Sequence, residues 1–167
     1  MLLEEIVIRA VKKDFLNLLE GMEEKDRDYL YGCALVTDKD FASIYLIANT
    51  VNQKERKSDK SEINYDWDIS NWRHSTKNLK KRELDDVSYK LMAILMEEKG
   101  GVKDITSPMF VRSLKRLRKE LEKNGIDTRD ICFFVTVDDE EKRGRKTEIE
   151  SAKEISRGFI LENFLGS

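Results

Sequence analysis

The chain has little proline, glycine, cysteine or histidine, and these shortages exclude several classes of protein. Its 167 residues include one proline and eight glycines, too few for a collagen-like or linker-rich chain. The two cysteines, Cys33 and Cys132, each lie in an apolar run, without CxxC spacing or neighbouring histidines, so the sequence indicates no zinc site. We expect both to be buried thiols in a reducing compartment.

Long apolar runs and an excess of one charge are also absent. No stretch of about 18 apolar residues occurs, and the start of the chain lacks the pattern of a signal peptide. Charged residues make up 38% of the chain, yet the net charge is only −2, too balanced for a dedicated nucleic-acid or membrane binder. We therefore expect a cytoplasmic protein with no membrane partner, in which residues 51–83 are locally basic.

The apolar spacing predicts one α+β domain over residues 1–167, with amphipathic helices packed on a small antiparallel or mixed β-sheet. Apolar positions three and four apart predict a first helix over 3–22, and two apolar runs around a Thr-Asp-Lys-Asp turn predict a hairpin over 29–50. Residues 51–64 are almost entirely polar, which predicts an exposed loop.

The second half of the chain is expected to add more helices and one more strand. An apolar stripe predicts a helix from Leu84 that ends at two glycines, and Ser107 followed by Pro108 predicts the start of a helix over 108–124. The run 131–137 is apolar throughout, which predicts a strand in the centre of the sheet. A short final helix should follow.

The sequence carries no strong catalytic pattern. His74 is the only histidine, and there is no nucleophile elbow and no glycine-rich phosphate loop. The best enzymatic signal is acidic: Asp138, Asp139 and Glu140 follow the strand 131–137, with Lys142 nearby. Carboxylates at the end of a strand can hold a divalent cation for nuclease chemistry; a solvated turn explains the same residues.

Two features suggest binding instead. At 100° per residue, five cations of the helix 108–124 share the face opposite its apolar residues; they are Arg112, Lys115, Arg116, Lys119 and Lys123. Tyr65, Trp67 and Trp72 concentrate large aromatic side chains in a short segment, as interface hot spots do. Ordinary solvation of the helix, and core packing of the aromatic residues, explain the same patterns.

Two segments in this order resemble a bacterial family known as domain of unknown function 4303. The first is Tyr31-Gly-Cys-Ala-Leu-Val-Thr-Asp-Lys-Asp-Phe-Ala-Ser-Ile, continuing to Ala48-Asn-Thr50, and the second is Tyr65-Asp-Trp-Asp-Ile-Ser-Asn-Trp72. The second resembles the family's pair of tryptophans after a polar loop. The chain departs from the family near its end, where Arg157-Gly158-Phe159 stands in place of an expected Asn-Pro.

The resemblance implies no catalytic motif, because the family has no established activity. Its members are suspected to be immunity proteins, which bind and neutralise one cognate bacterial toxin. The expectation is therefore a toxin-binding immunity protein without a cofactor, a bound metal, a nucleic-acid partner or catalysis of its own. The alternative is a nucleic-acid-directed protein, such as a metal-dependent nuclease using the acidic cluster. The oligomeric state stays open.

Overall fold

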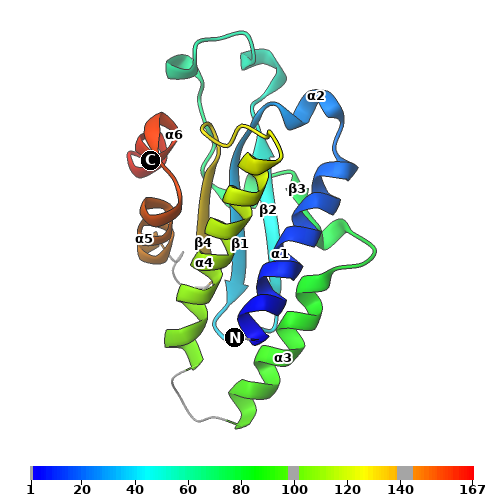
Figure 1. The fold of residues 1–167 in the computed structure, drawn as a ribbon. Helices are drawn as coiled ribbons and strands as arrows, with labels where there is room; N and C mark the ends of the chain where they lie inside the picture. The colour runs from blue at the N-terminus through cyan, green and yellow to red at the C-terminus, as the bar shows by residue number, and fades with distance from the viewer. Residues whose placement is uncertain (1, 98–101, 139–144) are drawn as a thin grey trace.

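The computed structural model describes residues 2–97, 102–138 and 145–167, and within these ranges four strands form one mixed sheet (Figure 1). Strands β1 (Leu30–Asp38) and β2 (Ile44–Thr50) form the predicted antiparallel hairpin, and β3 (His74–Ser75) extends it beyond β2. Strand β4 (Cys132–Asp138) runs parallel to β1. The order is β3-β2-β1-β4, and the predicted α+β class is confirmed.

Three helices cover one face of the sheet, which we call the helical face: α1 (Leu2–Gly21), α3 (Glu83–Glu97) and α4 (Val102–Lys123) (Figure 1). Side chains alternate along a strand, so Cys33 and Leu35 of β1 face these helices, whereas Ala34 and Val36 face away. A short helix, α2 (Glu24–Arg27), links α1 to β1. Within the described ranges, no helix has both the length and the apolar character needed to cross a membrane.

The opposite face, which we call the aromatic face, is covered by α5 (Arg145–Ile155), α6 (Gly158–Leu165) and the segment between β2 and β3. That segment contains only the short 3-10 turns η1 (Gln53–Glu55), η2 (Lys60–Glu62) and η3 (Ile69–Asn71), and a further turn, η4 (Thr76–Asn78), follows β3. Residues 51–64 are mostly exposed and form neither a strand nor an α-helix.

The expectation that residues 131–137 lie in the centre of the sheet is wrong, because β4 is an edge strand. Its apolar residues are buried because α4 packs on one side and α5 and α6 on the other. Serine hydroxyls form the hydrogen bonds that the backbone of a further strand would form with β4. Ser156 Oγ accepts from the N–H of Phe133 at 2.8 Å, and Ser151 Oγ accepts from the N–H of Val135 at 2.8 Å.

The helix predicted over 108–124 begins six residues earlier, at Val102, so Ser107 is not its N-cap and Pro108 lies inside it. A proline inside a helix removes one backbone hydrogen bond. The next residues, Met109 and Phe110, are buried in the helical-face core, and this burial holds the segment against the sheet despite the lost bond.

The N-terminus of α3 is capped by a residue that is distant in sequence. The buried carboxylate of Asp14, in the middle of α1, accepts from the N–H groups of Glu83 at 2.8 Å and Leu84 at 3.0 Å. Burial raises the pKa of Asp14, and these two hydrogen bonds oppose the rise. The cap therefore fixes α3 against α1.

Candidate functional site

A β-bulge in β1 shapes the aromatic face. Leu30 pairs with Thr50 and Gly32 pairs with Asn49, so Tyr31 is an extra residue between two paired positions. A bulge of this kind changes the direction of side chains and is common beside functional sites. Here it places Tyr31 and Gly32 together on the aromatic face, at the end of the hairpin next to residues 51–66.

Gly32 lies beneath the two tryptophans. A Cβ atom added at Gly32 would lie 2.6 Å from Cη2 of Trp72 and 3.2 Å from Cζ3 of Trp67. Only a glycine therefore allows the rings to approach the strand this closely. Trp67 is 5% and Trp72 6% exposed, so both tryptophans pack in the core, and they cannot offer a broad contact area to a partner.

Tyr31 lies at the centre of this aromatic cluster. The centroid of its ring is 5.1 Å from that of Trp67, 6.0 Å from that of Trp72 and 5.1 Å from that of Tyr65. The peptide carbonyl of Asp66 joins the cluster, because it accepts from Tyr31 Oη and from Trp72 Nε1, both at 2.7 Å. The two segments that carried the family resemblance thus pack directly on each other.

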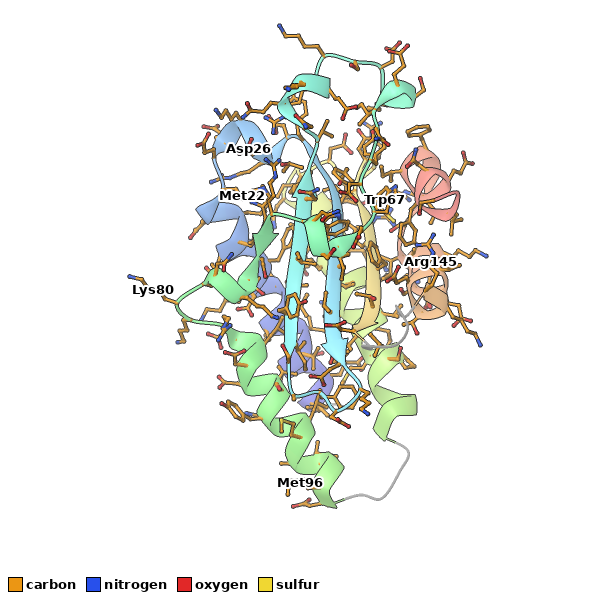
Figure 2. All side chains as sticks on the ribbon, turned by 180° about the vertical axis from the view of Figure 1, so that it is seen from behind. Met22, Asp26, Trp67, Lys80, Met96 and Arg145 are labelled. Atoms are coloured by element: carbon orange, nitrogen blue, oxygen red, sulfur yellow. The ribbon has the colours of Figure 1, made fainter. Side chains whose placement is uncertain are left out.

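A cavity of about 870 Å³ opens beside this cluster. Its wall is formed by the end of β2, by Tyr31 and Arg73, and by residues 51–55 and 63–66, which rise beyond the sheet (Figure 2). Arg56 holds the covering segment in place: it donates to the carbonyl of Val51 in the same segment at 3.0 Å and to the carboxylate of Asp26, which is distant in sequence, at 2.8 Å. The cavity is therefore preformed, as ligand sites usually are.

Asn49 is the unusual residue of this cavity. It is 8% exposed, and its Nδ2 donates to Tyr31 Oη at 2.8 Å. Burial raises the pKa of Tyr31 to about 12, so the phenol stays neutral and its own proton goes to the carbonyl of Asp66. This arrangement fixes the orientation of the Asn49 amide, and its buried Oδ1 accepts no hydrogen bond in the described structure.

The model of a family described as "Domain of unknown function (DUF4303)" matches residues 5–155. The chain belongs to the DUF4303 family. The searches of curated proteins and of solved structures returned no match.

The DUF4303 chain presents its predicted cationic face on α4. Its apolar side, with Leu114, Leu117 and Leu121, is buried, and all five predicted cations are exposed. Two of them are paired within the chain, Arg112 with Glu4 and Arg116 with Glu120. The other three form no ion pair with any described residue; they are Lys115, Lys119 and Lys123.

The acidic cluster of the DUF4303 chain lies mostly outside the described residues, which include Asp138 but not Asp139, Glu140 or Lys142. Asp138 is exposed at the end of β4, opposite Asp38 of β1 in the parallel register. One oxygen of Asp38 already caps the hairpin turn by accepting from the N–H groups of Asp40 and Ala42. Among the described residues, no group of three metal-ligating side chains occurs.

The two thiols are buried and the histidine is half-buried. Cys33 and Cys132 are free thiols on opposite faces of the sheet, and burial raises the pKa of Cys132 to about 12, which keeps it protonated. Burial and the nearby Arg73 lower the pKa of His74. This histidine lies 3.5 Å from Thr50 Oγ1, on the short strand β3.

The predicted binding residues therefore lie in two separate places. Tyr65 is half-buried and lines the cavity, whereas the cations lie on α4, which packs on the opposite face of the sheet. Sequence reasoning missed Asn49 and Arg73. The available signal for Asn49 was an amide at the end of an otherwise apolar strand, where an unpaired polar side chain has to find a partner.

Proposed function

We propose that the protein works by binding another protein, a cognate bacterial toxin, which it neutralises in the cytoplasm without catalysis of its own. The observation that supports the binding step is the row of unpaired lysines on α4, Lys115, Lys119 and Lys123. The neutralising role comes from the resemblance of the chain to suspected immunity proteins. The buried free thiols agree with a reducing compartment.

The geometry of α4 suits recognition of an acidic surface. Residues four apart in a helix are about 6 Å apart along its axis, so the backbone positions of the three lysines span about 12 Å along α4. Three leucines on the other side of the helix fix it to the core, so the backbone that carries the row is held in place. Such a row accelerates encounter with a complementary acidic partner and disfavours others.

The two arginines of this face are paired within the chain, whereas the three lysines are not. Arg112 and Arg116 lie on the same face but hold carboxylates of their own chain, which lowers their attraction for a partner. The three lysines form no ion pair with any described residue, although Glu120 attracts Lys123 over a longer distance. We therefore place the acidic contact of the toxin on the lysine row.

The test is affinity capture of the tagged protein from its source cells, in three forms. The first is the wild-type protein, and the second carries Lys115→Glu, Lys119→Glu and Lys123→Glu. The control carries Lys57→Glu, Lys80→Glu and Lys90→Glu, which change the net charge equally at exposed positions elsewhere. Lys80, for example, points away from the molecule (Figure 2).

We expect the wild-type and control proteins to retain the same protein in equal amounts, with release by added salt, and the α4 variant to lose it. The captured protein is then expressed alone and together with each form. Growth arrest that the wild-type protein relieves and the α4 variant does not relieve supports neutralisation. A harmless partner contradicts the immunity role, and retention of nucleic acid alone favours the nuclease alternative.

A further inference from the structure

The outer face of α3 carries an apolar stripe that the described residues leave uncovered. Tyr89 is 72% exposed and Met96 is 86% exposed, and they are the two most exposed large apolar side chains among the described residues. Ala93, between them, is also exposed. At 100° per residue the three positions lie within about 60° of one another around the helix axis. They form one surface, which we call the α3 stripe.

The α3 stripe does not contribute to the core. The opposite side of the helix packs on the sheet through Leu84, Val87 and Leu91. The helix also extends past the ends of the strands, and Met96 lies near its outer end (Figure 2). Neighbouring apolar side chains that stay exposed on a folded domain mark an interaction surface.

Two charged side chains along one edge of the α3 stripe indicate what covers it. Lys90 and Glu97 are exposed and form no ion pair with any described residue. Both lie on the same side of Ala93 around the helix, whereas Tyr89 and Met96 lie on the other side. Lys90 comes three residues before Ala93 and Glu97 four residues after it. Each edge of the stripe therefore has complementary groups at its two ends.

We infer that the α3 stripe binds a second copy of this chain, with the two α3 helices antiparallel and a twofold axis at Ala93. A twofold axis brings the same surface of both copies together, and here it places each edge of the stripe against the same edge of the partner in the reverse direction. Lys90 then pairs with the partner's Glu97. Tyr89 packs on the partner's Met96, a favourable contact between an aromatic ring and sulfur. Each contact occurs twice, and the small side chain of Ala93 lets the helices approach closely at the axis.

This self-association does not depend on the toxin. The lysine row lies on α4, and α1 packs between α3 and α4 (Figure 1), so the row stays free in the dimer. The contact involves one turn of helix on either side of Ala93, so the dimer should be weak and should form as the concentration rises.

Sedimentation velocity of the full chain, from micromolar to millimolar concentration, tests the inference. The wild-type protein should shift from the mass of one chain toward twice that mass. Tyr89→Glu and Met96→Glu should stay monomeric. Gln53→Glu is the control, because it adds the same charge at an exposed position outside α3; it should dimerise like the wild-type protein.

The charged edge allows a sharper test. Lys90→Glu and Glu97→Lys should each weaken the dimer about tenfold, because each brings like charges together at both ends of the contact. An equal mixture of the two variants should associate as the wild-type protein does, because the mixed dimer again has a pair of opposite charges at both ends.

A cysteine at Ala93 locates the axis. The two native cysteines are buried, so the thiol of Ala93→Cys is the reactive one, and mild oxidation should join its two copies across the axis. Asp86→Cys is the control. Asp86 is exposed on the same helix, but its two copies would be about 21 Å apart along the helix axes, too far for a disulfide.

Three results would overturn the inference. The first is a wild-type protein that stays monomeric at about 1 mM, a concentration at which even a weak specific contact is occupied. The second is a mixture of Lys90→Glu and Glu97→Lys that associates no better than either variant alone. The third is a monomeric wild-type protein whose captured toxin is lost with Tyr89→Glu, which would assign the stripe to the toxin. The capture control that carries Lys90→Glu should be monomeric and still retain the toxin, so failure of this inference is distinguishable from failure of the proposed function.

Discussion

Two serine hydroxyls cover the edge of β4, and their removal should destabilise the fold. Ser156 Oγ accepts from the N–H of Phe133 and also lies 3.0 Å from the carbonyl of the same residue. Ser151 Oγ accepts from the N–H of Val135 and lies 2.7 Å from the carbonyl of Thr147. Both hydroxyls are buried, so Ser151→Ala and Ser156→Ala each leave a strand N–H without a partner.

The expected loss follows from that orphaned donor. A buried N–H without an acceptor costs about 1–3 kcal/mol, and for a domain of this size each kcal/mol lowers Tm by about 2–4 °C. We expect each single variant to lose about 2 kcal/mol of unfolding free energy and about 4–8 °C in Tm. The double variant should lose nearly the sum, because the two serines bind different strand residues.

Urea unfolding, followed by circular dichroism, measures the free energies, and hydrogen exchange measures the amides of Phe133 and Val135 directly. Ser113→Ala is the matched control. Ser113 is equally buried, but its hydroxyl only donates to the carbonyl of Met109 within α4, so its loss orphans no N–H. If the two edge variants are no less stable than Ser113→Ala, the edge serines do not replace a strand, and the reasoning fails.

Three further predictions concern the other features. Gly32→Ala should cost about 1–3 kcal/mol and shift tryptophan emission, because the new methyl group displaces Trp72; Gly21→Ala, which meets no atom within 4 Å, should do neither. Asp14→Ala should cost about 0.5–2 kcal/mol and speed hydrogen exchange at the first amides of α3. Because the pKa of Tyr31 is raised to about 12, the folded protein keeps a proton that the unfolded chain loses above its ordinary value of about 10. The unfolding free energy should fall between these pH values, and urea unfolding at several pH values should show a smaller fall in Tyr31→Phe.

Local sequence patterns were sufficient to predict the elements that are defined by their own periodicity. The first helix, predicted over 3–22, spans Leu2–Gly21, and the hairpin around the Asp-rich turn is present. The start of α4 could not be predicted from a local pattern. Ser107 and Pro108 have the local signature of a helix start, but contacts of Met109 and Phe110 with the core extend the helix past it.

The place of β4 and the role of the cavity residues depended on distant contacts. A strand that is apolar on both faces looks central, and nothing in residues 131–137 shows that serines about 20 positions later complete its edge. For the same reason, the sequence alone did not decide whether Trp67 and Trp72 are buried in the core or exposed on the surface. Their burial follows from Gly32, more than 30 residues earlier, and from the bulge at Tyr31.

The parallel pairing of β1 with β4 has a consequence for synthesis on the ribosome. Strand β2 ends at Thr50 and β4 starts at Cys132. About 80 residues are therefore synthesised after β2 before β4 can pair with β1. At about 5–20 residues per second, this interval lasts roughly 4–16 s. During that time the side of β1 that will pair with β4 is an unpaired apolar edge. Chaperones can bind this edge, and other chains can aggregate on it.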